Sequence, residues 1–465
     1  MTKDIQLFDY QEDMVKRVLE TFRYHDSVMV QMPTGTGKTH VLAAIVGLFL
    51  KKNVCIVAHR RELVSQIKDT LARFFHALDS EKIQVTSIQW LSRHYREIKE
   101  KPSLIVIDEA HHALAETYTE VMNAYPKAKK LGLTATPYRM NGKGFTDLFD
   151  TLLYSWSMEK FIAEGRLSLY DYYSIKPDSA AQLLIDSLQK RGADGDYQQK
   201  ELNEVMDVRP SLERLCLTVK QYVPGKKGIV YAISIQHAEH IAEYYRDNGI
   251  KAVAISSKTP LAERQELIER FKFSSLSSSL KSKNDEIEVL VSVDLFSEGF
   301  DCPDVEFIQL ARPTLSLAKY MQMVGRGLRV AEGKEYCVIL DNVGLYKRFG
   351  LPSVDRDWQS MFEGRTSLED ILQETCMQVN SHNCRMDLMM DGDEDMMKII
   401  NHERQQQMII DTYGYQIVED EKGLKGIKDK DGKMILECQY KKIEVTNDGF
   451  AYCYIRKKVG RKEWI

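Results

Sequence analysis

The stretch QMPTGTGKTH, residues 31–40, decides the fold of the N-terminal part of this 465-residue chain. It follows the apolar run 27–30 and precedes a second apolar stretch, 41–50, which we expect to be helical. Gly35 and Gly37 lack a Cβ, so the backbone can curl there and direct its N–H groups inward. A strand, a glycine-rich loop and a helix in this order predict a phosphate cradle at the N-terminus of the helix.

Two side chains of the loop complete this cradle. Lys38 would place a positive charge at the β- and γ-phosphates of a nucleotide, and the Thr39 hydroxyl could hold Mg²⁺. Met32 stands where the full G-x-x-x-x-G-K-[ST] pattern has its first glycine. The residues expected to bind the phosphates are Thr34, Gly35, Thr36, Gly37, Lys38 and Thr39.

The composition limits the classes of protein to consider. The formal net charge of −4 argues against a strongly basic protein, so any contact with nucleic acid must come from local patches. Eight scattered cysteines without a C-x-x-C pair are typical of a reduced, cytoplasmic protein. The polar N-terminus and the lack of an apolar run of membrane-spanning length predict neither a signal peptide nor a membrane span.

Short apolar runs alternate with longer amphipathic stretches in two parts of the chain, a pattern that predicts parallel α/β sheets. We expect a first lobe at residues 1–165, a connection at 166–204 and a second lobe at 205–350. The expected strands lie at 28–30, 54–57, 104–107, 131–134, 228–233, 252–255, 289–293, 307–310 and 336–340.

The pattern changes after residue 350. Residues 351–410 are rich in Met and acidic side chains and predict a helical extension, with methionines filling core gaps. Residues 411–465 predict a small β module, because Asp431-Gly432 separates two alternating runs and this dipeptide is a strong hairpin signal.

Two carboxylates follow the apolar run 104–107. In a fold with a phosphate loop, an Asp at the C-terminal end of a neighbouring strand reaches the Mg²⁺, and Asp108 fits this position. The next acid, Glu109, could orient and deprotonate an attacking water. The sequence therefore predicts a site for phosphoanhydride hydrolysis.

Several short motifs resemble those of superfamily 2 helicases. They are GTGKT, DEAHH and Thr134-Ala-Thr-Pro137, followed by VSVDLFSEGFDCPDV at 291–305 and QMVGRGLR at 322–329. The resemblance covers about residues 5–345, and the forms EGFDCP, DEAHH and TATPYR are closest to the branch that contains the repair helicase XPB. It implies two tandem RecA-like P-loop domains that use ATP and Mg²⁺. Residues 426–443 resemble, more weakly, a WG-type β repeat.

The resemblance also implies roles for individual residues. Gln11 matches the glutamine that reads adenine, and Phe8 stands where this branch usually carries an arginine. Arg326 and Arg329 are expected to reach the γ-phosphate from the second lobe, as an arginine finger does. Further nucleotide contacts are expected from Gly299 and Asp301. Coupling of hydrolysis to lobe movement is expected from His111, Thr134, Thr136 and Gln322, and contact with the nucleic-acid backbone from Arg60 and Arg61.

The function implied is that of an ATP-dependent DNA helicase or double-strand DNA translocase that grips the phosphate backbone without reading sequence. Two alternatives stay open. One is an RNA helicase or remodeller, since contacts to the 2′-OH cannot be read from sequence. The other is an ATP-gated clamp that recruits a protein partner through residues 355–465. We expect a cytoplasmic protein of a bacterial or phage-infected cell, without membrane contact.

Overall fold

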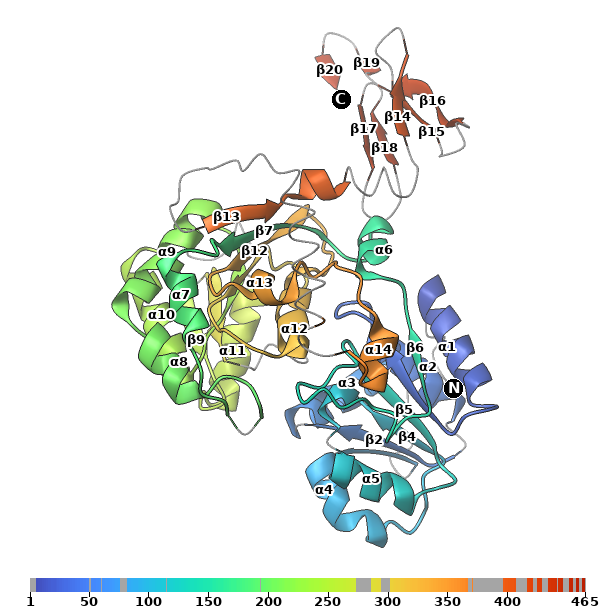
Figure 1. Ribbon diagram of the computed structural model, residues 1–465. Coiled ribbons are helices and arrows are strands. Elements are labelled where there is room, and N and C mark those ends of the chain that lie inside the picture. Colours follow the sequence, from blue (N-terminus) through green and yellow to red (C-terminus); the bar gives the residue numbers. More distant parts are fainter. Residues whose placement is uncertain are drawn as a thin grey trace.

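The computed structural model describes two α/β lobes and a separate set of C-terminal strands (Figure 1). The described residues are 6–49, 52–59, 61–75, 82–113, 115–192, 194–272, 286–293, 302–366, 370, 396–406, 416–420, 425–428, 434–440, 442–445, 451–454, 457–459 and 462–464.

The first lobe is built on a six-stranded sheet in the order β3-β2-β4-β5-β1-β6, with all neighbours parallel. Its central strands are fully buried, as the continuous apolar runs require of strands covered on both faces. The strands are β1 (Ser27–Gln31), β2 (Val54–Ala58), β3 (Ile83–Ser87), β4 (Leu104–Ile107), β5 (Lys129–Thr134) and β6 (Thr151–Tyr154).

Helices cover both faces of this sheet. One core cluster holds side chains of α1, α2 and α3, and a second cluster holds side chains of α4 and α5. The helical segments are α1 (Asp9–Thr21), α2 (Lys38–Leu48), α3 (Arg61–Phe74), α4 (Ile88–His94), α5 (Ala115–Ala124) and the short 3₁₀ turns η1 (Tyr95–Glu97) and η2 (Ala110–His112). The helix α6 (Met158–Ala163) then leads out of the lobe.

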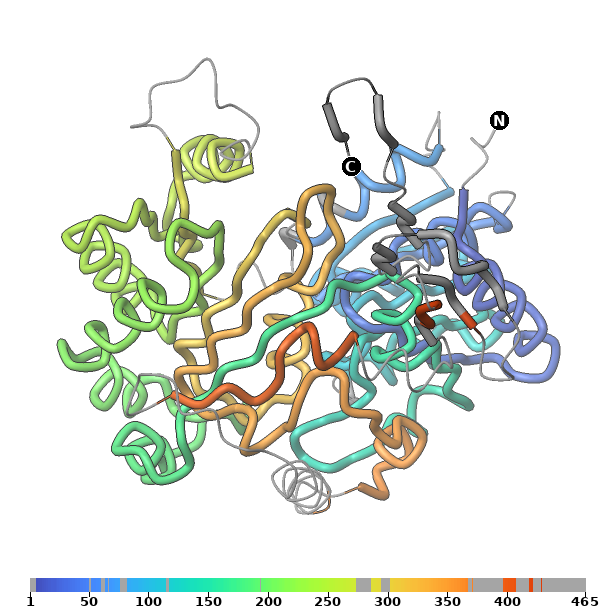
Figure 2. The backbone as a smooth tube through the Cα atoms, turned by 90° about the horizontal axis from the view of Figure 1, so that it is seen from above, coloured from blue at the N-terminus to red at the C-terminus, as the bar shows by residue number. Residues whose placement is uncertain are grey.

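The second lobe is built on a seven-stranded sheet in the order β13-β7-β12-β11-β8-β10-β9. All neighbours are parallel except β13, which runs antiparallel to β7 along the sheet edge (Figure 2). Its strands are β7 (Leu169–Ile175), β8 (Gly228–Tyr231), β9 (Ala252–Ile255), β10 (Val289–Ser292), β11 (Phe307–Leu310), β12 (Tyr336–Asp341) and β13 (Met396–Ile400). Its helices are α7 (Ala180–Asp186), α8 (Gln199–Met206), α9 (Arg209–Tyr222), α10 (Ile235–Asp247), α11 (Leu261–Lys272), α12 (Leu317–Gly327) and α13 (Leu345–Phe349).

Two predicted boundaries are wrong. Strand β7 lies within the predicted connection 166–204, yet it pairs with β12 over six positions, so the second lobe begins before residue 205. Strand β13 lies within the extension predicted to be helical at 351–410. Both runs, LYDYYSI and MMKII, mix polar and apolar residues, and pairing with neighbouring strands decides their conformation where local sequence does not.

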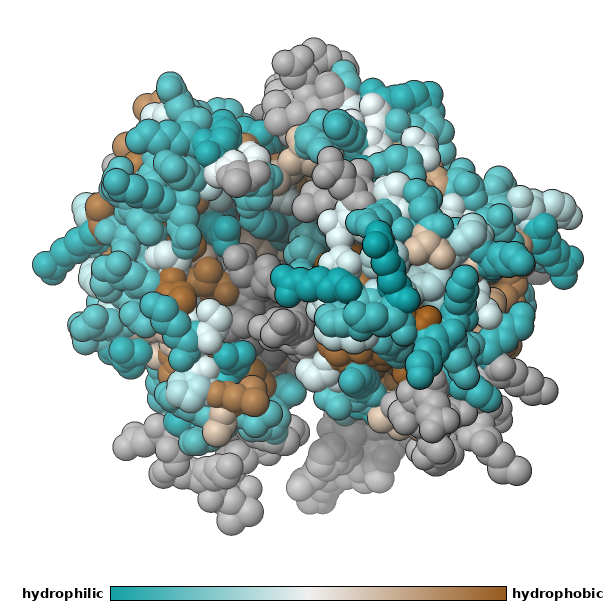
Figure 3. Space-filling view, turned by 90° about the horizontal axis from the view of Figure 1, so that it is seen from below, coloured by the Kyte–Doolittle hydropathy of each residue, from teal (hydrophilic) through white to brown (hydrophobic). Residues whose placement is uncertain are grey.

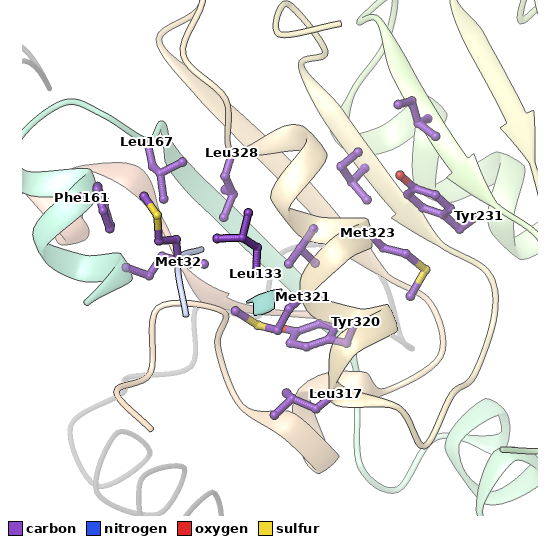
Figure 4. Close-up of a cluster of buried hydrophobic side chains, with 14 of the residues drawn as sticks. Met32, Leu133, Phe161, Leu167, Tyr231, Leu317, Tyr320, Met321, Met323 and Leu328 are labelled. Carbon is purple, nitrogen blue, oxygen red and sulfur yellow. The ribbon is translucent and has the colours of Figure 1, made fainter. Parts of the chain in front are cut away.

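The two lobes share a continuous hydrophobic core. One buried cluster contains Met32 and Leu133 of the first lobe, Phe161 of α6, and Met321 and Leu328 of the second lobe. Figure 4 shows these side chains gathered where α12 meets the first lobe. Because apolar area is buried between the lobes, the hydrophobic effect favours their contact.

A later segment returns from the second lobe to the first. In α14 (Trp358–Glu363), Phe362 joins the core cluster of the first lobe, and its carbonyl oxygen accepts a hydrogen bond from the N–H of Phe145 at 2.7 Å. Figure 1 places α14 beside the first lobe. The chain therefore passes from the first lobe to the second after α6, and α14 brings it back to the first lobe before β13 joins the sheet of the second.

The C-terminal strands form three small antiparallel sheets. The strands on either side of the predicted turn at 431–432, β15 and β16, pair antiparallel as a hairpin requires. The strands are β14 (Gln416–Glu419), β15 (Lys425–Lys428), β16 (Met434–Tyr440), β17 (Lys442–Val445), β18 (Ala451–Tyr454), β19 (Lys457–Val459) and β20 (Lys462–Trp464). The face in Figure 3 is mostly hydrophilic with scattered apolar residues, and among the described helices none has the length and apolarity needed to cross a bilayer.

Candidate active site

The phosphate loop joins β1 to α2 and needs its glycines for conformational reasons. Gly35 and Gly37 have φ angles of 91° and 80°, in the left-handed region that other L-residues rarely adopt. Gly37 is also the residue that precedes the first turn of α2. This bend aims the helix N-terminus, with its partial positive charge, at the loop.

Met32, which replaces the first glycine of the phosphate-loop pattern, has a structural role. Its side chain is fully buried in the core between the lobes (Figure 4). Its carbonyl oxygen lies 3.2 Å from Lys38 Nζ, and that of Pro33 lies at 3.4 Å, so the loop holds the lysine over its own backbone. The missing glycine therefore leaves the loop's curl intact.

Four charged side chains act electrostatically on Lys38. Loss of hydration lowers its pKa most, and the positive charges of Arg326 and Arg329 lower it further. The carboxylates of Glu109 and Asp108 oppose this decrease. The structure thus brings together, around one ammonium group, residues from the ends of β4 and α12 that belong to different lobes.

The second lobe touches the phosphate loop directly. A methyl group added to Gly325 in α12 would lie 2.5 Å from the Cβ of Thr34. A methyl group added to Gly35 would lie 3.3 Å from the Cγ of Arg329. The two lobes therefore touch at two points along the boundary between them, which we call the seam. Arg329 lies beside the loop without any movement of the lobes.

Glu109 adopts a strained backbone conformation. Its φ angle of 49° is the only positive value among the described residues other than glycine. The Glu109 N–H donates to Asp108 Oδ1 at 3.1 Å, and Glu109 Oε2 lies 3.3 Å from His111 Nδ1. The turn after β4 thus orients both carboxylates, and strain of this kind is commonly retained at functional sites.

A hydrogen-bonded chain links the turn after β4 to the end of β5. Burial holds the pKa of His111 well below its usual value, so the ring is neutral at physiological pH. Its Nδ1 lies 3.0 Å from Thr134 Oγ1, which also accepts from the N–H of Thr136 at 3.1 Å and donates to the Thr136 carbonyl at 3.2 Å. Because the hydroxyl proton is used in that donation, His111 donates through Nδ1–H.

Three of the residues predicted to couple hydrolysis to movement carry buried polar atoms without a protein partner in the described structure. These atoms are His111 Nε2, Thr136 Oγ1 and Gln322 Nε2. Such groups cost free energy unless a ligand or water completes them. These three atoms are therefore available to a ligand or a water.

Gln11, the residue expected to read the base, lies against the phosphate loop at Thr36. Gln11 is buried; its Nε2 donates to the Thr36 carbonyl at 3.0 Å, and its Oε1 accepts from the Phe8 N–H at 3.0 Å. The Tyr10 hydroxyl donates to the same Thr36 carbonyl at 3.0 Å. Sequence reasoning did not assign Tyr10, although its place next to Gln11 could have indicated it.

The residues expected to hold Mg²⁺ fit that ion. Thr39 lies in the first turn of α2, and Asp108 follows β4, which is separated from β1 only by β5. The orientation of the Asp108 carboxylate is set by its bond to Glu109. One hydroxyl and one carboxylate are a sufficient protein share for Mg²⁺, which keeps several waters and takes phosphate oxygens from a nucleotide.

Some predicted residues fall outside this description. Arg60, Gly299 and Asp301 lie outside the described residues, and so does the side chain of Arg61 at the start of α3.

Comparison with known proteins identifies the family. Residues 4–139 match the family described as type III restriction enzyme, res subunit, and residues 210–331 match the helicase conserved C-terminal domain. A 51.5 kDa protein of a Lactococcus phage is 34% identical over 72% of this chain and 70% of its own length. The chain therefore belongs to the superfamily 2 helicases, and the predicted class of ATP-hydrolysing protein is confirmed.

Other relatives are more distant. A Saccharomyces cerevisiae protein named as an ATP-dependent helicase, IRC3, is 29% identical over 73% of this chain but only 51% of its own length. The DNA 3′-5′ translocase XPB2 of Sulfurisphaera tokodaii is 27% identical over 70% of this chain and 79% of its own length. A fragment of an HsdR subunit of a Vibrio vulnificus type I restriction enzyme aligns with a TM-score of 0.55 at 21% identity, covering 76% of this chain and 66% of that one. This similarity confirms the predicted fold of two RecA-like domains.

Proposed function

We propose that this protein is an ATP-dependent DNA helicase or double-strand DNA translocase that hydrolyses ATP at the seam between its lobes. One observation carries the proposal: Gly325 and Arg329 of the second lobe lie against Thr34 and Gly35 of the phosphate loop. The carboxylates of Asp108 and Glu109 act on Lys38 of the same loop. A nucleotide at this place would bind the joined lobes better than the separated ones, and such differential affinity moves a two-state equilibrium.

In this proposal, each side of the seam has its own part in hydrolysis. Lys38 and the loop amides bind the β- and γ-phosphates, and Glu109 takes the proton of the attacking water. Arg326 and Arg329 stabilise the charge that develops on the γ-phosphate. Bound Mg²⁺, held by Thr39 and Asp108, would neutralise charge between the phosphates.

Loss of the γ-phosphate would remove what the arginines bind, so the lobes would separate. The series of contacts from Glu109 through His111 and Thr134 to Thr136 would transmit the loss of the γ-phosphate to the end of β5 in the first lobe. If both lobes grip one strand through its phosphates, each cycle moves the protein along it without reading sequence. Arg60 and Arg61 are the proposed contacts on the first lobe, and Gly299 and Asp301 add proposed contacts to the nucleotide.

The names of the relatives favour DNA over RNA as the partner. A DNA 3′-5′ translocase is among them. The RNA helicase and the ATP-gated clamp remain the alternatives to test. The XPB-like branch, the WG-type nature of residues 426–443, a protein partner for residues 355–465 and action in the cytoplasm of a bacterial or phage-infected cell are further parts of the proposal.

The test compares steady-state ATP hydrolysis without nucleic acid and with single-stranded DNA, duplex DNA or RNA of matched length. We expect stimulation by DNA, lost at high salt because backbone contacts are screened. Strand displacement on tailed duplexes and removal of a third strand from a triplex then separate unwinding from translocation. Greater stimulation by RNA would favour the remodeller, and slow turnover that no nucleic acid changes would favour the clamp.

A further inference from the structure

A lysine ammonium group binds the backbone at the end of α12. Lys334 Nζ donates to the carbonyl oxygen of Gly327 at 2.5 Å and to that of Arg329 at 2.8 Å. It also donates to the carbonyl oxygen of Pro303 at 3.1 Å. An ammonium has three N–H donors, so each of them meets one carbonyl. Loss of hydration lowers the pKa of Lys334, as expected of an ammonium that has exchanged water for carbonyls.

The backbone that Lys334 binds lies where a helix no longer holds it. α12 ends at Gly327, and the last carbonyls of a helix have no partner within the helix. A lysine near this end satisfies them and interacts favourably with the helix dipole. The carbonyl between the two bound by Lys334, that of Leu328, accepts from the Ser168 N–H at 2.8 Å. Three consecutive carbonyls, at 327–329, are therefore held from outside the helix, two of them by Lys334.

This backbone carries the arginine side chain that lies at the phosphate loop. The Cγ of Arg329 is 3.3 Å from where a Cβ on Gly35 would lie. The carbonyl of Arg329 is bound by Lys334, so the side chain leaves a fixed backbone and passes directly beside the loop. A displacement of this backbone would move the guanidinium relative to the nucleotide, and a misplacement of about 1 Å can cost about 10²-fold in rate.

Lys334 itself has a rigid support. Its N–H donates to the Ala331 carbonyl at 3.2 Å, and β12 begins two residues later, at Tyr336. Strand β12 pairs with β7 on one side and β11 on the other. The ammonium therefore connects the backbone of Arg329 to the central sheet of the second lobe.

We propose that Lys334 is a positioning residue for ATP hydrolysis, because its ammonium fixes the backbone of Arg329 so that the guanidinium can meet the γ-phosphate. This inference rests on the proposed function and concerns how its arginine is held. The donors of Lys334 are all used by carbonyls, so it would act through Arg329 and not on the nucleotide itself. Because the same ammonium binds Pro303, the end of α12 and the segment before β11 would move as one unit when the lobes separate.

The experiment measures the single-turnover rate of hydrolysis of radiolabelled ATP, with DNA present, in Lys334→Met and Lys334→Gln. Both remove the ammonium, and the glutamine keeps a polar group beside the carbonyls should the methionine variant fail to fold. We expect a loss of about 10²-fold in each, the scale of a displacement of about 1 Å. The dissociation constant of ADP, which lacks the γ-phosphate, should stay within about twofold.

Lys129→Met is the matched control. Lys129 Nζ also donates to a backbone carbonyl, that of His25 at 3.0 Å, but it does so at the start of β5, whereas the site lies at the other end of that strand. The control should change neither the rate nor the binding of ADP.

A double-mutant cycle with Arg329→Ala separates positioning from general support of the lobe. If Lys334 acts through Arg329, then Lys334→Met or Lys334→Gln should lower the rate of Arg329→Ala by less than about twofold, because the two residues are then fully coupled. A residue that merely stabilises the lobe would lower the rate by the same factor with or without Arg329.

Three results would overturn the inference. Equal losses in the two backgrounds would mean that Lys334 supports the lobe and not Arg329. Weaker ADP binding in step with the rate would mean that it supports the whole nucleotide pocket. Unchanged rates in both lysine variants would mean that other contacts hold Arg329. Failure of the proposed function would look different, since Arg329→Ala alone would keep its rate or the unaltered protein would not hydrolyse ATP.

Discussion

Thr34 of the phosphate loop and Gly325 of α12 are in direct contact across the seam between the lobes. The Cβ of Thr34 lies 2.5 Å from the position that a Cβ on residue 325 would take. A glycine inside a helix costs stability relative to alanine by about 1 kcal/mol. The close approach of α12 to the loop explains why the helix carries one there.

The first prediction concerns this contact. Gly325→Ala should favour the helix locally but push α12 away from the loop, and overpacking of this kind costs about 1–3 kcal/mol. We expect steady-state ATP hydrolysis to fall about tenfold or more, because α12 can no longer lie against the phosphate loop. Gly47→Ala in α2 is the control, because its Cβ would make only an ordinary contact, 3.4 Å from Phe75. Unchanged hydrolysis in Gly325→Ala would show that the seam opens before reaction.

The second prediction concerns the proposed base. Glu109→Gln keeps the size of the side chain but removes the group that accepts the proton. The single-turnover rate should fall about 10²–10⁴-fold, while ATP binding stays close to that of the unaltered protein. Calorimetry and quenched-flow assays measure the two quantities. If ATP binding disappears with the rate, Glu109 holds the nucleotide or the loop and is not the base.

The third prediction concerns coupling through Thr134. Thr134→Val keeps the shape but leaves His111 Nδ1–H and the Thr136 N–H without their buried acceptor. We expect the ATP consumed per base pair displaced to rise at least about fivefold, the lower end of typical coupling free energies. Thr21→Val, whose hydroxyl bonds the Arg17 carbonyl on α1, serves as the control. If the ATP consumed per base pair displaced stays unchanged, the contacts of His111, Thr134 and Thr136 do not couple hydrolysis to movement.

The fourth prediction concerns acid stability. His237 is fully buried in the second lobe, and burial lowers its pKa to about 4, with Asp207 opposing and His240 reinforcing the decrease. The unfolded chain binds this proton near pH 6.5 and the folded chain does not, so stability falls as pH drops from about 6.5 towards 4. His237→Gln removes this contribution. Its melting temperature should fall less than that of the unaltered protein between pH 7 and 4.5, and parallel curves would contradict the assignment.

Much of the fold could be predicted because strands buried on both faces of a parallel sheet have continuous apolar sequences. The runs at 104–107 and 307–310 became β4 and β11 with the same bounds. Strands β3, β6, β7 and β13 were not predicted, because each contains polar residues and none is a continuous apolar run of the kind that marks the other strands. Their conformation depends on the strands that lie next to them in the fold, and the local sequence does not show which strands those are.

The site was predictable where its residues are close in sequence and fixed by chemistry, as in the phosphate loop and the Asp108-Glu109 turn. Contacts between distant segments were not. The contact of Lys334 with Pro303 and the approach of Gly325 to Thr34 join different elements, and neither pair carries a local signal. Such pairs follow from how the lobes pack.

The most direct test of a nucleotide site shared by two lobes is the single-turnover rate of ATP hydrolysis in Arg326→Ala, measured with DNA present and ATP saturating. The account predicts a loss of about 10³-fold or more, as for other arginine fingers, with the melting temperature preserved and Arg329→Ala behaving alike. A loss of less than about tenfold, well below the range of arginine fingers, would contradict it, because the second lobe would then contribute no charge to the reaction.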